Sequence, residues 1–238
     1  MAFACALVCA LAQSPGGYPA HWWTPVRDAS VPAWEILPQA ALPGEVILSK
    51  RNELGILSNF AATPFVLHGR RYASVEGFWQ MMLYPEGPRD PRAKASGITW
   101  PHTRGEVAAM TAFAAKDAGT TAEENMRKMG IDWVTFEGLR FPYRSKTKGV
   151  HYRLILEAMQ AKLQQNPQVR QILLSTGNLV LRPDHVEEPD PPAEWLYFKI
   201  WMDIRTELQK NIGPRMHANA REYTRIPLMS PRKTYTQL

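Results

Sequence analysis

The sequence predicts an α+β fold in which helices predominate and the strands are short. The segment 151–165 places Leu154, Ile155, Ala158 and Leu163 on one face, which is the spacing of an amphipathic helix. Several other segments open with the capping signals of helices. With 238 residues and a hydrophobic fraction of 45%, the chain suffices for one well-packed domain with extensions, or for two small domains.

The first predicted elements are a strand near 45–50, a β-hairpin and a helix. Apolar residues flank the pair His68-Gly69, which fits a hairpin turn. Ser74 is a good N-cap for a helix that extends to about residue 84, where Pro and Gly residues break it.

Two capping boxes predict two helices in the middle of the chain. A T-x-x-E pattern at Thr103 opens a helix that ends at Gly119. A second such pattern at Thr121 opens a short helix that stops at Gly130. The aromatic segment 131–144 is predicted as strand or loop.

The elements after the amphipathic helix are two further helices and a strand. Asn166 as N-cap and Pro167 at the first helical position open a helix that Gly177 closes. The segment 179–185 is predicted as a short strand that ends in a turn, and 191–213 contains the last helix.

Three regions follow from this division. Residues 1–45 are predicted as a Pro-rich N-terminal extension, 46–212 as one folded domain, and 213–238 as a basic, flexible tail. The tail contains one acidic residue, Glu222, and five basic residues: Arg215, Arg221, Arg225, Arg232 and Lys233.

An apolar run at the start of the chain bears on where the protein resides. It ends in Ala10-Leu11-Ala12, which resembles a signal-peptide cleavage site. No Lys or Arg precedes the run, and it is too short to span a bilayer, so a disordered extension or an early start codon is the simpler interpretation. We expect a cytoplasmic protein that does not associate with membranes, and secretion stays open.

Composition and motifs exclude several kinds of site. The net charge of +6 is compatible with nucleic acid, nucleotides or phosphorylated metabolites, without selecting among them. Both cysteines, Cys5 and Cys9, lie in the N-terminal extension, and the six histidines show no metal-ligand spacing. No nucleotide-binding glycine loop or nucleophile elbow is present in the sequence. We therefore expect no metal and no cofactor.

Glu76 is the first candidate for chemistry. It falls in the first turn of the helix that Ser74 caps, between apolar Val75 and aromatic Phe78 and Trp79. Stabilisation by the helix dipole explains a carboxylate there without any function. Alternatively, aromatic neighbours could desolvate the carboxyl and raise its pKa, as suits a general acid or base.

Other side chains offer binding roles beside ordinary structural ones. Aromatic residues at element ends are more often core, but some stack on flat bases: Phe60, Trp79, Trp133 and Trp195. Asn59 and Asp184 either cap turns or bond ribose hydroxyls. Lys162 is either a snorkelling surface lysine or a buried nucleophile with a lowered pKa.

Ordered blocks of the sequence resemble the NADAR family, also called the YbiA-like or DUF1768 family. They cover about 46–210 and are "LGILSNF" with "PFVLHGRRYASVEGFWQ", then "AAKDAG", "MGIDWV", "ILEAMQAKLQQNPQVRQILLSTGN" and "IWMDIRTEL". The resemblance implies a single compact domain with N-glycosidase activity on ribosylated bases. The implied substrates are ADP-ribose on guanine of nucleic acid, or ribosylamine intermediates of riboflavin biosynthesis.

The resemblance also implies roles for the candidate residues. Glu76 occupies the family's "VE" position, where a carboxylate can stabilise an oxocarbenium-like centre or activate water. Aromatic residues such as Trp79, Trp133 or Phe60 would stack on the base, and Asn59 and Asp184 would contact the ribose.

Three departures from the family pattern affect these expectations. Gly77 stands where the family often has His, and Leu83 where it often has Lys, so a lysine imine would need Lys162 or another lysine. Trp195 remains, but a glycine-rich loop before the last helix is replaced by "RPDHVEEPDPPAEWLYFKIW". We therefore expect the substrate to differ from that of the common bacterial form.

Two hypotheses follow for function. One is an N-glycosidase on a ribosylated base or nucleotide, with nucleic acid carrying ADP-ribose as one partner. The alternative is a non-catalytic module that binds ADP-ribose or a nucleotide. The basic tail adds recruitment of nucleic acid to either hypothesis. The sequence does not address oligomeric state.

Overall fold

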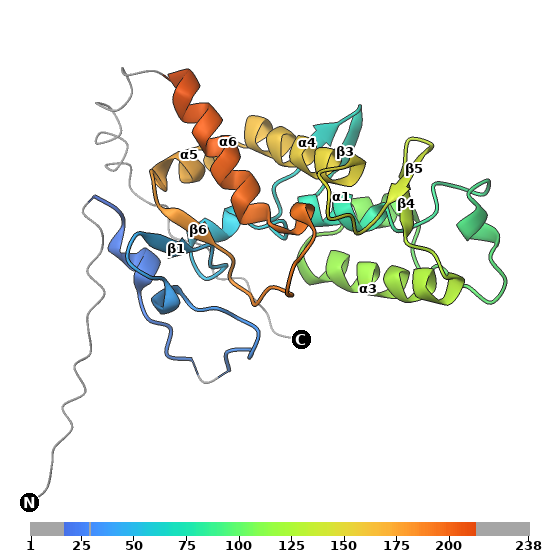
Figure 1. Cartoon of the computed structure of the whole chain (residues 1–238), viewed down its shortest axis with the longest axis horizontal. Helices are drawn as coiled ribbons and strands as arrows, with labels where there is room; N and C mark the ends of the chain where they lie inside the picture. Colours follow the sequence, from blue (N-terminus) through green and yellow to red (C-terminus); the bar gives the residue numbers. More distant parts are fainter. Residues whose placement is uncertain (1–16, 29, 213–238) are drawn as a thin grey trace, which may run out of the picture.

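The computed structural model describes residues 17–28 and 30–212, which form six α-helices and three two-stranded sheets in an α+β arrangement (Figure 1). The helices are α1 (Val75–Met81), α2 (Arg104–Ala108), α3 (Ala112–Met129), α4 (Val150–Gln165), α5 (Pro167–Ser175) and α6 (Tyr197–Ile212). The strands are β1 (Glu45–Ile47), β2 (Phe65–Leu67), β3 (Arg70–Tyr72), β4 (Trp133–Phe136), β5 (Leu139–Pro142) and β6 (Val180–Arg182). The predicted fold class is confirmed.

One sheet joins distant parts of the chain, and the other two are hairpins. β1 pairs in parallel with β6, so that Val46 lies opposite Leu181. β2 pairs with β3 and β4 with β5, both antiparallel. The turn between β2 and β3 needs a left-handed backbone, which His68 (φ 49°) and Gly69 (φ 74°) adopt, as predicted for this hairpin.

Helix α1 is the central element of the fold. All seven of its residues are buried, and it lies between α3 and α4 (Figure 1). Ser74 caps it by accepting a hydrogen bond from the backbone N–H of Gly77 at 2.9 Å, as predicted. A Cβ on Gly77 would meet the carbonyl oxygen of Met110 at 2.5 Å, so a glycine here permits the close approach of the segment after α2.

The predicted boundary between two helices near Gly119 is wrong. Helix α3 runs without interruption through Gly119 and Thr121 to the left-handed cap at Gly130 (φ 65°). A Cβ on Gly119 would overlap the side chain of Gln80 from α1, so this glycine serves helix packing rather than termination. Thr121 bonds the carbonyl of Asp117 within the helix instead of capping one.

The structure also contains the other elements predicted between residues 103 and 177, with small differences in capping. Thr103 forms the predicted capping box at the start of α2, and 131–144 forms the β4–β5 hairpin. Asn166 precedes α5, but its side-chain amide donates to the carbonyls of Pro64 and Lys162 rather than capping the helix. The apolar start of the chain and the basic tail lie outside the described residues.

Part of the predicted N-terminal extension contributes to the core. Trp22 and Trp23 are buried in the same hydrophobic cluster as α1 and α4. The indole N–H of Trp23 donates to the carbonyl of Glu45 at 2.9 Å. Further along, Glu35 forms an antiparallel bridge with His185, so residues before 46 lie against the segment after β6.

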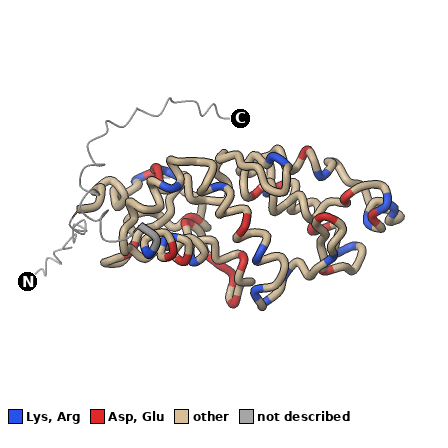
Figure 2. The backbone as a smooth tube through the Cα atoms, turned by 90° about the horizontal axis from the view of Figure 1, so that it is seen from above, with Lys and Arg blue, Asp and Glu red and all other residues tan. Residues whose placement is uncertain are grey.

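Charged residues of both signs are interspersed along the described backbone (Figure 2). The tail carries five basic residues and one acidic residue, so +4 of the net charge of +6 belongs to 213–238. Within the described part of the chain, no helix is both long enough and apolar enough to cross a membrane.

Candidate functional site

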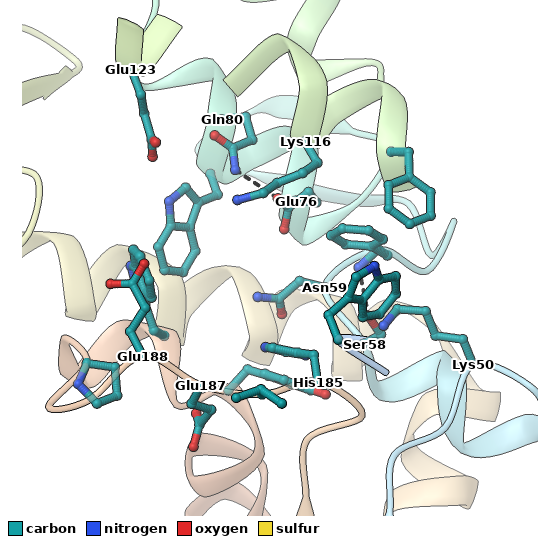
Figure 3. Close-up of a pocket in the computed structure, with 18 of the residues that line it drawn as sticks. Lys50, Ser58, Asn59, Glu76, Gln80, Lys116, Glu123, His185, Glu187 and Glu188 are labelled. Atoms are coloured by element: carbon teal, nitrogen blue, oxygen red, sulfur yellow. Dashed lines mark hydrogen bonds between the residues drawn. The ribbon is translucent and has the colours of Figure 1, made fainter. Parts of the chain in front are cut away.

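A cavity of about 440 Å³ lies where α1, α3, the loop before β2 and the segment after β6 meet (Figure 3). It is lined largely by aromatic and charged side chains: Trp34, Lys50, Ser58, Asn59, Phe60, Glu76, Trp79, Gln80, Phe113, Lys116, Glu123, Tyr143, His185, Val186, Glu187, Glu188, Pro191, Trp195 and Tyr197. Its volume is within the range of small-molecule sites.

Glu76 lies in the wall of this cavity, in the first turn of α1. Its side chain is buried, with 7% of the residue exposed. The side-chain amide of Gln80, one turn later, donates to Glu76 Oε1 at 2.8 Å (Figure 3). The backbone N–H of Glu76 donates to the carbonyl of Asn59 at 3.0 Å. The carboxyl is therefore fixed in position while its second oxygen stays available.

The surroundings of Glu76 favour its protonated form. Burial raises the pKa of this carboxyl above its ordinary value of 4.5. The hydrogen bond from Gln80 and the charges of Lys116, Lys50 and His185 act in the opposite direction but do not cancel the effect of burial. A carboxyl whose pKa is raised by burial in a cavity suits general acid–base catalysis.

Two buried donors hold the loop that carries Asn59. Lys162 Nζ donates to the carbonyl of Ser58 at 2.8 Å, and the indole N–H of Trp201 donates to the carbonyl of Leu57 at 2.7 Å. Together with the bond from Glu76 to Asn59, they fix this loop against α1, α4 and α6. Asn59 is thereby placed in the cavity wall next to Glu76 (Figure 3).

Lys162 itself does not line the cavity. It is completely buried beneath the loop, and burial lowers its pKa from 10.5 to about 7. Its ammonium group contacts the carbonyl of Ser58 and lies 5.8 Å from the ring centre of Trp201. The lowered pKa agrees with the predicted buried lysine, but the geometry gives Lys162 the task of holding the loop rather than attacking a substrate.

Four buried polar atoms of the lining residues have no hydrogen-bond partner among the residues that the structure describes. They are Asn59 Oδ1, Gln80 Oε1, Trp195 Nε1 and the hydroxyl oxygen of Tyr197. Gln80 Oε1 packs against Gly119 of α3. Because buried polar groups in proteins are almost always paired, the other three atoms supply hydrogen-bonding capacity for a polar ligand in the cavity.

Asp184 is close to the cavity but outside its lining. Its carboxylate accepts two hydrogen bonds from Lys50 Nζ, at 2.8 and 2.5 Å, and lies 3.2 Å from His185 Nδ1. Burial alone would raise the pKa of Asp184, but the bonds from His185 and Lys50 outweigh it and lower the pKa. The ribose contact predicted for Asp184 stays a prediction, since this residue is outside the lining. In the structure Asp184 bonds Lys50 and His185, which do line the cavity.

The far end of the cavity holds a chain of hydrogen bonds. The indole N–H of Trp79 donates to the Tyr143 hydroxyl at 3.2 Å, and that hydroxyl donates to Glu123 Oε1 at 2.8 Å. Burial raises the pKa of Tyr143 well above its usual value, so the hydroxyl keeps its proton. Trp195 lines the same end, with the Arg144 guanidinium 4.7 Å from its ring centre.

Trp133 is not part of the cavity. The central guanidinium carbons of Arg92 and Arg140 lie 5.0 and 3.8 Å from its ring centre. The predicted stacking on a base therefore has no geometric support at Trp133, because its ring contacts arginines and does not line the cavity. Phe60, Trp79 and Trp195 are the predicted aromatic residues that the structure brings to the cavity.

Several lining residues were not predicted from the sequence. Lys116 stands in the "AAKDAG" block, which was a signal for this position. Gln80 follows Glu76 by one helical turn, so that spacing alone could have paired them. Lys50, Glu123 and His185 reach the cavity only through tertiary contacts between segments far apart in the chain, and no local pattern marks them.

The fold and the cavity define an α+β protein with a buried carboxyl in an aromatic-lined pocket. No family model matches the chain, and no curated protein matches it by sequence. Among solved structures, the NMR structure of the E. coli protein YbiA is similar, at 18% identity and a TM-score of 0.43. The similarity covers 72% of this chain and 89% of YbiA.

Proposed function

We propose that the protein hydrolyses the N-glycosidic bond between a ribosyl group and a base. The substrate is either ADP-ribose attached to guanine of nucleic acid or a ribosylamine of riboflavin biosynthesis. The observation that carries the proposal is the buried Glu76 carboxyl, with a raised pKa, in the wall of an aromatic-lined cavity.

Cleavage of a ribosyl N–C bond places positive charge on the sugar and requires a proton for the departing base. In its protonated form, Glu76 can donate that proton to a ring nitrogen of the base. The carboxylate that results stabilises the oxocarbenium-like centre and then accepts a proton from the water that attacks the anomeric carbon. Gln80 holds one carboxyl oxygen, so the other faces the substrate.

Sequence blocks that resemble the NADAR family supply the residues at this site, which supports the proposal. Asn59, Glu76 and Lys116 come from three separate blocks, yet all three line one cavity. An imine mechanism receives no support from Lys162, because its amine is directed to the Ser58 carbonyl. We therefore assign the chemistry to the carboxyl group.

The test is hydrolysis by the Glu76→Gln variant on both substrate classes, with detection of the released ribosyl product. General acid–base catalysis typically contributes ~10²–10⁴-fold, so a loss of at least that order is expected. Glu157→Gln is the matched control, because this carboxylate lies outside the cavity with its side chain 45% exposed. Full turnover by Glu76→Gln on both substrates would refute the proposal.

Protein stability separates loss of catalysis from loss of folding. Because the pKa of Glu76 is raised in the folded state, its contribution to stability is greatest below pH 4.5 and declines as pH rises through the folded-state pKa. Glutamine has no such titration and can accept the same bond from Gln80. Thus Glu76→Gln should be at least as stable as the wild type at neutral pH. Ligand binding by the wild type without release of a base would favour the binding-module alternative.

A further inference from the structure

A buried histidine–glutamate pair contacts the residues that line the far end of the cavity. His151, in the first turn of α4, is 2% exposed, and Glu194, in the short 3₁₀ helix Ala193–Trp195, is fully buried. His151 Nδ1 lies 3.0 Å from Glu194 Oε1 and 2.8 Å from the carbonyl oxygen of Tyr143. The pair joins two positions 43 residues apart, and neither member lines the cavity itself.

The tautomer of His151 follows from its partners. A carbonyl oxygen only accepts hydrogen bonds, so Nδ1 carries a proton and donates to the Tyr143 carbonyl and to Glu194 Oε1. The other polar atoms of the pair, His151 Nε2 and Glu194 Oε2, are buried and have no partner within the described ranges. Among the residues that the structure describes, the Glu194 carboxyl is therefore held by His151 alone.

Each member of the pair is joined to the cavity wall. The ring of His151 lies edge-to-face with that of Trp79, with ring centres 4.9 Å apart and an interplanar angle of 73°. Its centre is 5.4 Å from the ring centre of Tyr143. Glu194 directly precedes Trp195, and Trp79, Tyr143 and Trp195 all line the cavity. Because the Glu194 side chain is fixed on α4, the place of Trp195 in the wall is fixed with it.

The pair is poorly suited to a purely stabilising role. A buried carboxyl group loses its hydration, and a single side-chain hydrogen bond compensates for only part of that loss. Apolar side chains of similar size often replace buried polar pairs without loss of stability. A half-satisfied pair directly behind a cavity therefore favours a role in fixing geometry.

We propose that Glu194 is a positioning residue: held by His151, it fixes Trp195 in the cavity wall in the orientation that meets a ligand. The effect on turnover rests on the proposed function. The position of Trp195 does not, because it can be measured without a substrate.

Three variants of the full chain test the proposal. Glu194→Leu removes the acceptor at similar volume, and the His151 that remains keeps its bond to the Tyr143 carbonyl. Glu194→Gln is the conservative variant, because its amide oxygen can still accept from Nδ1. Asp190→Asn is the control, because this carboxylate lies in the same segment outside the cavity, with its side chain 73% exposed.

Fluorine NMR of protein labelled with 5-fluorotryptophan reports the position of Trp195. Its signal is the one missing from Trp195→Leu, and the Trp133 signal, assigned in the same way, is a reference from outside the cavity. The Trp195 signal should move or broaden in Glu194→Leu, and should stay near its wild-type position in Glu194→Gln and Asp190→Asn. The midpoint of urea denaturation of Glu194→Leu should not fall below that of the wild type.

Two results would overturn the proposal. One is a Trp195 signal that stays in place in Glu194→Leu, or that moves equally in Glu194→Gln. The other is a lower denaturation midpoint together with a shift of the Trp133 signal, because the pair would then support the whole fold rather than one wall of the cavity.

The hydrolysis assay asks whether Glu194 acts through Trp195. Glu194→Leu should raise KM severalfold with little change in kcat, and it should add no further rise in a chain that already carries Trp195→Leu. Equal rises in both backgrounds would contradict the proposal. If the wild type hydrolyses neither substrate class, the proposed function fails, while the fluorine signals still decide whether Glu194 positions Trp195.

Discussion

The two ends of helix α1 differ in whether the buried polar groups near them have hydrogen-bond partners. Near its start, Glu76 is buried with one side-chain hydrogen bond, and the nearby Asn59 Oδ1 has no partner among described residues. Beyond its last turn, the guanidinium groups of buried Arg92 and partly buried Arg104 donate hydrogen bonds to the buried carbonyls that follow the helix. One end is built for stability, and the other retains polar groups for a ligand.

The satisfied end shows what a structural polar cluster requires. Arg92 is 1% exposed and donates to the carbonyls of Met82, Leu83 and Tyr84. It also pairs with Asp90 at 2.8 Å. Arg104 adds bonds to some of the same carbonyls, and burial lowers its pKa to about 10. These donors satisfy the buried carbonyls of the three residues that follow α1.

The largest expected effect is on stability, and it concerns Arg92, which bonds the carbonyls that follow α1. Arg92→Leu leaves Asp90 without its buried partner and removes donors from three carbonyls, so we expect a loss of about 3–5 kcal/mol in unfolding free energy. Urea denaturation measures it. Lys210→Leu breaks an exposed pair with Glu207 and should change stability by less than about 1 kcal/mol. Equal losses in both variants would contradict the assigned structural role.

The second effect concerns Lys162, a buried charge beneath the site. A pKa lowered from 10.5 to about 7 corresponds to about 5 kcal/mol. Below pH 7 the folded protein bears this cost in full. As pH rises from 7 to 10.5, the unfolded lysine binds a proton that the folded one does not, so wild-type stability increases.

Lys162→Met removes this titration but leaves the Ser58 carbonyl without a donor, at a cost of about 1–3 kcal/mol. The variant should therefore be more stable than the wild type by about 2–4 kcal/mol at pH 6. Above pH 10.5 it should be less stable. Chemical denaturation across this pH range locates the crossing. A constant difference between the two proteins at all pH values would show that Lys162 does not titrate as described.

Local patterns predicted the elements whose signals are contained in a few residues. The cap at Ser74, the box at Thr103 and the turn at His68-Gly69 each depend on neighbours within about four positions. Gly119 was wrongly predicted to end a helix. A glycine is needed there because the side chain of Gln80, on another helix, packs against it. Local sequence cannot distinguish a glycine that ends a helix from one that admits a neighbour.

The site was predictable only in part for the same reason. Glu76, Asn59 and Trp195 were found because apolar surroundings make a polar or aromatic residue conspicuous. Asp184 was equally conspicuous, yet its partner Lys50 is 134 positions away in sequence, and that ion pair turns the carboxylate from the cavity. Whether a buried polar residue is satisfied depends on tertiary contacts that single-sequence patterns do not contain.

A matched pair of tryptophans sharpens the comparison further. Trp195 and Trp133 each have an arginine over the ring, but only Trp195 of the two lines the cavity. In the hydrolysis assay, Trp195→Leu should raise KM by about tenfold through lost stacking. Trp133→Leu should leave KM within about twofold and lower stability by about 1 kcal/mol through lost cation–π contacts. A larger rise in KM for Trp133→Leu than for Trp195→Leu would instead place the substrate near Trp133 and Arg92.

The smallest effect tests the electrostatics around Glu76. The charge of Lys116 lowers the pKa of that carboxyl, so Lys116→Met should raise it further. The limb of the kcat–pH profile that reports Glu76 should then move to higher pH. It moves in this direction for either protonation state, since only the slope of the limb depends on whether the active form is the acid or the carboxylate.

Lys128→Met is the control for this shift, because Lys128 lies exposed near the other end of α3. It should leave the limb in place. If Lys116→Met moved the limb to lower pH, or both variants moved it equally, the limb would belong to a group other than Glu76. That outcome would contradict the assignment of catalysis to Glu76 near the start of α1, although the cavity itself would remain a candidate binding site.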